Sequence, residues 1–185
     1  MTKFAAPLGR TLHACLLAAA ALLVSGCAAE YQLGTTLPED CRDVYIPAIL
    51  NESGEPRAAT EMRRALEKEI RREGTLRIVS DEAYATTRLD VTVLKYEQEA
   101  TAFNRASTQS PSEYRMALTA HVSFVKLPRA AAGETAEVPI YGPKQVRGTE
   151  TFTGGADAVA NKMSCLPKTA KNLAETIVDG CVGAW

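Results

Sequence analysis

The sequence predicts an α+β domain in which two helices pack on one face of a mixed, roughly four-stranded β-sheet. Two segments carry apolar residues at helical spacing, each along one stripe. The other ordered segments are short runs rich in β-branched and aromatic residues. Covering the same sheet face is the simplest way for both helices to bury their stripes. The first strand–helix–strand unit can then be parallel, with a right-handed crossover.

Both helices are predicted from apolar residues spaced by three and four positions. The first covers residues 56–73, with Pro56 in its first turn and Gly74 as its C-cap. The second covers about residues 166–181, with Pro167 in its first turn, where a missing N–H costs no hydrogen bond. The inward-facing residues are Ala59, Met62, Leu66, Ile70, Ala170, Leu173, Ala174, Ile177 and Cys181.

The strands are predicted from alternation and composition. They cover residues 44–50, 76–80, 88–96, 114–126 and 146–153. The run 114–126 alternates most clearly, with Met116, Leu118, Ala120, Val122 and Phe124 on one face and Arg115, Thr119, His121 and Ser123 on the other. This pattern is typical of a half-buried antiparallel strand. Residues 97–113 are polar and are predicted to form a long loop, and residues 128–143 form a second loose segment.

The amino terminus has the layout of an export signal. Lys3 and Arg10 precede an uncharged run, residues 16–24, which is shorter than the roughly 20 residues that a membrane-spanning helix needs. Residues 23–27, Leu-Val-Ser-Gly-Cys, resemble the lipobox of bacterial lipoproteins. We therefore expect residues 1–26 to be removed as a signal peptide and Cys27 to carry acyl chains such as palmitate. An ordinary secretory signal, with Cys27 merely near its cleavage site, is the alternative.

The residues after Cys27 indicate where the mature protein resides and how it is organised. Ala28 replaces the aspartate that retains many lipoproteins at the inner membrane, so we expect the outer membrane, on its periplasmic side. Residues 27–40 are predicted to be a lipidated tether, and residues 41–185 a single domain. The mature 159 residues contain 19 basic and 22 acidic side chains, a balance of minus three that argues against nucleic-acid binding through bulk charge.

Three further cysteines lie in the predicted domain, at positions 41, 165 and 181. Cys165 and Cys181 flank the second predicted helix, which separates them by about 24 Å, beyond disulfide reach. Any bridge within the chain therefore joins Cys41 to Cys165 or to Cys181. Three free thiols are the alternative. A metal site is not expected there, because no histidine lies near these cysteines in the sequence.

Several segments together resemble the LptE family of lipopolysaccharide-assembly lipoproteins. Cys27 is followed closely by Tyr31-Gln32-Leu33-Gly34, similar to the family's Cys-Gly-Tyr-x-Leu opening. Further similar segments are Leu37-Pro38, Val44-Tyr45-Ile46-Pro47 and residues 74–79, 89–94, 113–118 and 173–178, with Trp185 at the end. The resemblance covers most of the mature chain.

The resemblance implies a role without catalysis or a cofactor. Members of the family sit as a plug within the outer-membrane barrel LptD, help it to assemble, and contact lipopolysaccharide on its way to the outer leaflet. The implied partners are thus an LptD-type β-barrel and lipopolysaccharide, whose phosphates attract cations. From their positions, Arg105 in the predicted polar loop and Arg115 at the exposed start of the next strand are candidate lipopolysaccharide contacts. The alternative for both is solvated surface charge.

The charged residues of the first predicted helix are explained by salt bridges on its surface. Arg64, Lys68, Arg71 and Arg72 share a side of the first helix with several glutamates, and Arg63–Glu67 and Glu67–Arg71 stand at salt-bridge spacing. We predict a solvent-facing, salt-bridged helix surface there.

Sequence motifs select neither a catalytic nor a metal site. After signal removal His121 is the only histidine, and no Gly-x-Ser-x-Gly elbow, phosphate loop or Cys–His ligand spacing occurs. A lipoprotein activator of a periplasmic cell-wall synthase is the alternative function, because such proteins also use tethered strand–helix–strand domains. An envelope hydrolase is the third class.

Overall fold

A computed structural model describes residues 37–104, 107–129 and 133–184. The predicted signal peptide, Cys27, most of the tether and Arg105 lie outside these residues. The described elements, in chain order, are η1 (Glu39–Cys41), β1 (Asp43–Tyr45), β2 (Leu50–Asn51), α2 (Ala58–Glu73), β3 (Arg77–Val79), η2 (Glu82–Tyr84), β4 (Thr87–Asn104), β5 (Ser107–Lys126), β6 (Val138–Thr153) and α3 (Ala158–Val182).

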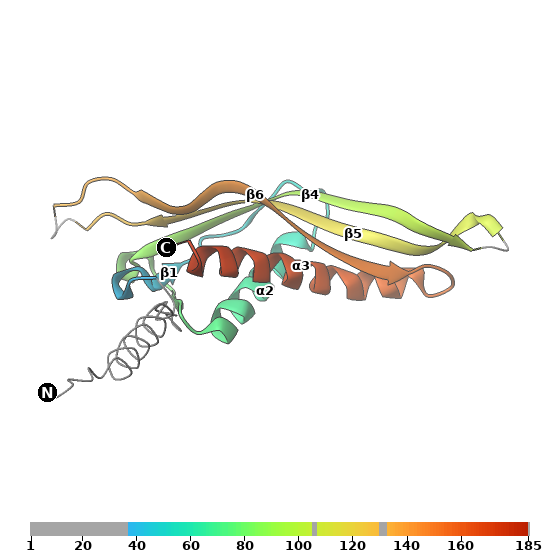
Figure 1. The fold of residues 1–185 in the computed structure, drawn as a ribbon, viewed down its shortest axis with the longest axis horizontal. Coiled ribbons are helices and arrows are strands. Elements are labelled where there is room, and N and C mark those ends of the chain that lie inside the picture. The colour runs from blue at the N-terminus through green and yellow to red at the C-terminus, as the bar shows by residue number, and fades with distance from the viewer. Residues whose placement is uncertain (1–36, 105–106, 130–132, 185) are drawn as a thin grey trace, which may run out of the picture. The chain divides into compact units, whose positions relative to one another are not determined.

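The predicted α+β class is confirmed, with two long helices on one side of a mixed sheet (Figure 1). The strand order is β3-β1-β4-β5-β6, and β2 pairs separately with β4. Pairings among β1, β2, β3 and β4 are parallel, whereas β4–β5 and β5–β6 are antiparallel. The sheet has six strands rather than roughly four. One reason is that the predicted strand 44–50 splits into β1 and β2 around Pro47, which lacks the N–H that a sheet ladder needs.

The predicted polar loop at residues 97–113 is wrong. β4 continues to Asn104 and β5 begins at Ser107, so the two strands form a long hairpin whose end we call the hairpin arm, residues 99–104 and 107–112. In a two-stranded ribbon the partner strand satisfies the inward-facing backbone groups and water satisfies the outward-facing ones, so an apolar run in the sequence is not required. The predicted loose segment 128–143 is also too long, because β6 begins at Val138.

The two helices differ in how closely they match their predictions. α2 ends as expected, with Gly74 at φ 83° and its N–H bonded to the Ile70 carbonyl at 3.0 Å. At its start, Ala58 rather than Ala59 is buried. α3 begins at Ala158, so Pro167 lies inside the helix and not in its first turn. Burial of Cys165 and Leu166 next to the proline holds this part of the helix on the sheet despite the missing hydrogen bond.

The core lies between the two helices and the sheet face that they cover. Leu66 and Ile70 of α2, Leu173 and Ile177 of α3, and the predicted apolar face of β5 are all fully buried. Apart from Ala120, each of these side chains contributes about 1.5–3 kcal/mol relative to an exposed one. The apolar faces of both helices and of β5 therefore form the core, as the sequence predicts.

α3 crosses β6 unusually closely at Gly148. A Cβ atom at this position would lie 2.6 Å from Leu173 Cβ and 2.7 Å from the Leu173 backbone nitrogen. Glycine is therefore needed because the helix backbone itself occupies the space of a side chain.

Side chains of α3 also close the outer edge of the sheet along β6. The Gly154 N–H donates to the Ser112 carbonyl, a register that directs the carbonyls of Thr149 and Thr153 away from β5. Asn172 Nδ2 donates to the Thr149 carbonyl at 2.8 Å, and Asn161 Nδ2 donates to the Thr153 carbonyl at 3.0 Å. Helix amides thus occupy acceptors that could otherwise pair with another strand.

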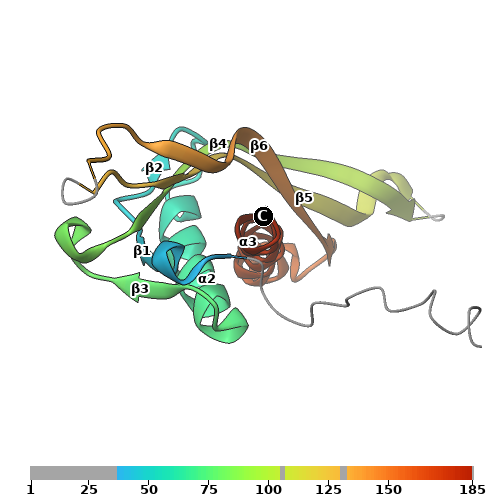
Figure 2. The same ribbon diagram turned by 60° about the vertical axis from the view of Figure 1, so that its left-hand side comes forward.

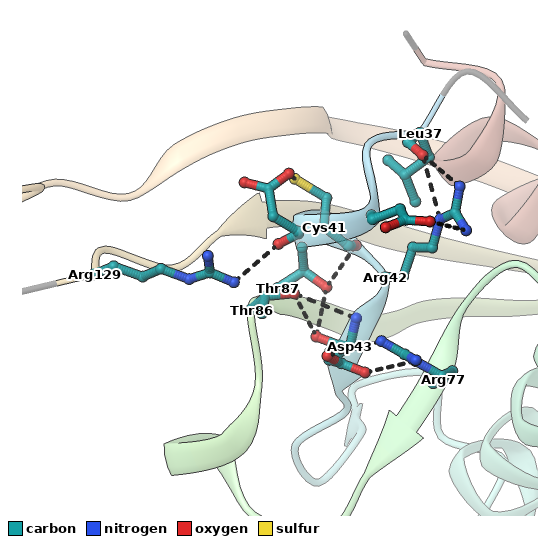
Figure 3. A network of polar contacts seen from close by, with 10 residues as sticks. Leu37, Cys41, Arg42, Asp43, Arg77, Thr86, Thr87 and Arg129 are labelled. Carbon is teal, nitrogen blue, oxygen red and sulfur yellow. Dashed lines mark hydrogen bonds and ion pairs between the residues drawn. The ribbon is translucent and has the colours of Figure 1, made fainter. Parts of the chain in front are cut away.

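The chain enters the domain through a network of polar contacts around η1 (Figure 3). Leu37 and Cys41 are buried, and the Arg42 guanidinium donates to the Leu37 carbonyl at 3.4 Å. Thr87 Oγ1 donates to the Asp43 carbonyl at 3.1 Å, and Arg129 Nη2 donates to the Asp40 carbonyl at 3.4 Å. These contacts tie the entry point to β4 and to the end of β5. We call this part of the domain the tether-entry end.

Within the described residues, no helix is both long and apolar enough to cross a membrane.

Candidate functional site

The face of the sheet opposite the helices is polar and forms the first candidate surface. Figure 2 shows α2 and α3 on one side of β4, β5 and β6, and no described helix lies on the other. We call this second side the open sheet face. Its side chains include Lys95, Glu97, Glu99, Arg115, Ala117, Thr119, His121, Gln145, Arg147, Thr149 and Thr151. The polar face predicted for residues 114–126 is therefore confirmed.

Charges on the open sheet face are organised around Glu97. Its carboxylate pairs with Lys95 at 2.6 Å and with Arg147 at 3.3 Å, which joins β4 to β6 across β5. The hydrogen bond from Lys95 lowers the pKa of Glu97, and the nearby Arg147 charge acts in the same direction. Sequence reasoning missed this arrangement because the three residues come together only through strand register.

Arg115 lies at the centre of the open sheet face, between Glu99 of β4 and Thr151 of β6. It is exposed and forms no ion pair with any described residue. The prediction that Arg115 marks the start of a strand is wrong, because β5 begins eight residues earlier at Ser107. Its backbone is paired with strands on both sides, and its exposed guanidinium is available to an anionic group. Arg105, the other predicted contact, lies outside the described residues.

The cations of α2 are mostly neutralised within the helix. Arg63 Nε and Glu67 Oε1 are 3.0 Å apart, and Arg71 Nη2 and Glu67 Oε2 are 3.3 Å apart, which confirms both predicted pairs. Arg72 pairs with Glu69 and also reaches Glu175 of α3 at 3.5 Å. These pairs make α2 a weaker candidate for binding anions than Arg115 is.

A second candidate surface is apolar and lies at the beginning of α3. Val159 and Met163 are 73% and 56% exposed, one turn apart on the same helix. They form the apolar part of a pocket of about 230 Å³ together with Tyr96, Met116 and Leu166, and its charged lining residues are Glu55, Arg57 and Lys162. We call the five residues of the apolar part the α3 apolar patch. Burial, followed by the charge of Glu55, raises the pKa of Tyr96 to about 12.

The α3 apolar patch was missed because the helix was predicted to start at residue 166. The four-residue spacing of Val159 and Met163 is the signal that could have revealed it.

The three domain cysteines are free and buried, so the structure contains neither the Cys41–Cys165 nor the Cys41–Cys181 bridge. Burial raises the pKa of all three thiols, and the Asp40 carboxylate adds to the effect at Cys41. Protonated, buried thiols are poor nucleophiles and poor metal ligands. No cluster of three or more His, Cys, Asp or Glu side chains that could hold a metal occurs in the described part of the chain.

We expect the domain thiols to resist alkylation until the domain unfolds. In native buffer, iodoacetamide should modify Cys41, Cys165 and Cys181 on the order of a hundredfold more slowly than in urea. A Ser164→Cys variant provides the control, because residue 164 is exposed next to buried Cys165 and should react at once. The number of modified thiols is read by mass spectrometry without reductant. A loss of two hydrogens in the native mass would reveal a bridge and contradict the expectation.

An extended charged face on one side of the sheet, and an apolar patch on the helix-covered side, are suited to contact a large surface. Comparison with known sequences defines the class further. The chain matches the LptE family, described as lipopolysaccharide-assembly, over residues 41–179. Because this match spans well over half of the chain, the protein belongs to the LptE family, and the resemblance found in the sequence is confirmed.

Several solved structures are similar to this chain at low sequence identity. The hypothetical protein CT253 from Chlamydia trachomatis has a TM-score of 0.53 and 10% identity, covering 74% of this chain and 92% of that one. A minor lipoprotein from Acinetobacter baumannii has a TM-score of 0.43 and 14% identity, covering 76% of this chain and 91% of that one. Rare lipoprotein B from Shewanella oneidensis has a TM-score of 0.41 and 14% identity, covering 73% of this chain and 91% of that one. No curated protein sequence matches the chain significantly.

Proposed function

We propose that this protein is an outer-membrane lipoprotein that acts as plug and assembly partner of an LptD-type β-barrel and helps to transport lipopolysaccharide to the outer leaflet. The observation that carries the proposal is the LptE family match, which extends over residues 41–179 and thus over nearly the whole domain. In this role the protein needs neither a catalytic group nor a cofactor. It acts through its surfaces.

The two candidate surfaces fit the two tasks of such a plug. The lumen of a large outer-membrane barrel is polar and hydrated, so the charged open sheet face can lie there without losing its solvation. The α3 apolar patch, with exposed Val159 and Met163, would be shielded from water where it contacts apolar side chains of the partner. Arg115 remains free to meet a phosphate of the lipopolysaccharide.

Acyl chains on Cys27 would anchor the protein to the periplasmic leaflet. Two or three chains give durable attachment, whereas a single chain binds only marginally. Ten Cα–Cα steps, through residues 28–36, separate Cys27 from Leu37, where the chain enters the domain. Fully extended, they span about 35 Å. The domain is thereby kept at the membrane in which its partner would lie.

Affinity purification of the lipidated protein from membranes tests the proposed partner. We expect a large, heat-modifiable β-barrel to copurify in stoichiometric amount. A Val159→Asp, Met163→Asp variant should lose much of the barrel, because two carboxylates would be buried in an apolar contact. Recovery of a penicillin-binding protein without a barrel would support a cell-wall synthase activator instead and would refute the LptD-type role.

Charge reversal tests the contact with lipopolysaccharide. Replacing Arg105 and Arg115 together with glutamate should weaken lipopolysaccharide binding by about tenfold or more, because charge-assisted hydrogen bonds contribute roughly 1.5–3 kcal/mol each. The matched control is the Lys68→Glu, Arg71→Glu pair, which changes net charge equally on exposed positions of α2. Binding is measured by titration, and folding by circular dichroism. An unchanged isotherm for the Arg105 and Arg115 variant would remove these residues from the proposal.

A further inference from the structure

We propose that the outer edge of β4 from Lys95 to Ala100 binds an extended segment of the barrel partner, which adds a strand to the sheet there. We call residues 95–100 the β4 edge. The inference rests on the proposed function and deepens it, because it names the part of the plug that the partner binds and the chemistry of the bound segment. That segment carries a basic side chain on one face and an apolar side chain on the other.

Beyond Val93, the outer side of β4 pairs with no described strand. β1 pairs with Thr87 and Arg88, and β2 pairs with Thr92 and Val93. The Glu52 N–H still donates to the Val93 carbonyl at 2.8 Å, but no further main-chain bond from a described residue reaches this side of β4. The β4 edge is therefore open, whereas side chains of α3 cover the opposite edge along β6.

Strand register identifies the main-chain groups that point outward from the β4 edge. The Gly154 N–H donates to the Ser112 carbonyl, so the even-numbered residues in this part of β5 direct their N–H and C=O groups toward β6. The β4 residues opposite them direct theirs away from β5, and these are Tyr96, Gln98 and Ala100. Donors and acceptors thus stand free at the spacing that a neighbouring strand requires.

Irregularities at both ends limit the length of this site. Register shifts lie between Val93 and Lys95 and between Ala100 and Ala102. Such irregularities bend a strand and interrupt its ladder of hydrogen bonds. A partner segment can therefore pair over about six residues, or about 20 Å, which is the usual length of a strand in a globular protein.

The helix side of the β4 edge offers a place for an apolar side chain. Tyr96 belongs to the α3 apolar patch, in which Val159 and Met163 are 73% and 56% exposed. Because side chains alternate along a strand, every second residue of an added strand would face the pocket of about 230 Å³ that this patch lines. Apolar cavities of about 150 Å³ already hold a benzene molecule, so the pocket has room for a large apolar side chain.

The other side of the β4 edge is acidic. Glu97 and Glu99 both lie on the open sheet face. Glu97 is already paired with Lys95 and Arg147, whereas exposed Glu99 forms no ion pair with any described residue. A lysine or arginine of the partner opposite Glu99 would form a favourable cross-strand pair. The charge pattern therefore selects a segment in which apolar and basic residues alternate.

The same charges disfavour a second copy of this chain as the added strand. Two β4 edges could pair antiparallel with Gln98 opposite Gln98, which would use all the outward positions. Glu97 of each copy would then lie directly opposite Glu99 of the other, and like charges at such positions are destabilising. A wall strand of the barrel is unsuited as well, because both of its edges are already paired in the closed wall. The bound segment therefore belongs to a loop or domain of the partner outside the wall.

Removal of one outward N–H tests the β4 edge. Gln98→Pro removes a donor that points away from β5, and proline is tolerated at such edge positions. Thr151→Pro is the matched variant, because its N–H points away from β5 on the opposite edge. Each full lipidated chain is purified from membranes, and the copurifying barrel is quantified after a salt wash. We expect Gln98→Pro to retain at least about fivefold less barrel than Thr151→Pro, because the bound segment loses a hydrogen bond and meets the proline ring. Equal retention would overturn the proposal.

Photocrosslinking gives a test that does not depend on whether the proline variant folds. The crosslinking amino acid p-benzoylphenylalanine at position 98 leaves the outward N–H in place, and circular dichroism verifies the fold. We expect the crosslinked peptide to come from the barrel partner, to lie outside its wall strands and to alternate apolar and basic residues. A crosslink to a second copy of this chain, a crosslink to wall strands alone, or no crosslink at all would refute the proposal.

The same preparations separate this inference from the function on which it rests. If no barrel copurifies with the unaltered chain, the proposed function is wrong and the inference is refuted with it. If the barrel copurifies but position 98 does not crosslink to it, the proposed function stands and only the role of the β4 edge is refuted.

Discussion

Replacing Gly148 with alanine should destabilise the domain by about 3 kcal/mol, at the upper end of the usual cost of overpacking. The added methyl group would lie 2.6 Å from Leu173 Cβ, 2.7 Å from the Leu173 nitrogen and 2.8 Å from its Cα. Two of these three atoms belong to the helix backbone, which no rotamer change can move away. α3 must therefore shift from β6, and the Asn172 bond to the Thr149 carbonyl is strained with it. Urea unfolding followed by circular dichroism measures the loss.

Two further variants show whether the cause is the backbone contact. Thr151→Ala lies on the same strand at an exposed position and should change the free energy of unfolding by no more than about 0.5 kcal/mol. Leu173→Ala in the Gly148→Ala protein should give no rescue, because alanine keeps all three clashing atoms of residue 173, namely Cβ, the backbone nitrogen and Cα. Recovery of stability in that double variant would show that the part of the Leu173 side chain beyond Cβ sets the approach of α3.

Replacing Cys27 with alanine should abolish lipidation completely, because the thiol is the group that carries the acyl chains. The amino-terminal peptide of the wild-type protein should begin at Cys27 and carry the mass of two or three acyl chains. In the variant, this modified peptide should be absent. Mass spectrometry of the membrane-extracted protein measures both, without depending on how an unprocessed precursor distributes between fractions.

Cys15 offers a matched control for Cys27, since both cysteines precede the domain. Cys15→Ala should leave the acylated peptide unchanged, because residue 15 is removed with the signal peptide. A wild-type amino terminus that starts upstream or downstream of Cys27 without added mass would instead support the ordinary secretory signal.

The parts of the fold that were predicted well are those that depend on near neighbours in the sequence. The α2 stripe and its end at Gly74 follow from residues within one helix, and the alternation of β5 follows from residues within one strand. Pro167 was misread because a local rule, proline in the first turn, was outweighed by burial of the flanking residues against the sheet. The hairpin arm was missed for a related reason, since its stability comes from a partner strand rather than from its own composition.

The candidate site was predictable only in part. Alternation along β5 placed Arg115 on the face opposite the core, and the structure agrees. It did not indicate that Glu97 joins Lys95 to Arg147, because those residues belong to strands far apart in sequence. The α3 apolar patch combines residues of β4, β5 and α3, so no single segment of the sequence contains it.

By itself, the sequence determined the α+β class, the apolar faces of both helices and of β5, and the resemblance to the LptE family. Those features depend on composition and periodicity, which act over one or two turns or a few strand residues. Only the tertiary structure decided the strand order, the long β4–β5 hairpin, the close approach at Gly148 and the capping of β6 by Asn161 and Asn172. Each of these is a pairing between distant segments, whose register is set by the packed core as a whole.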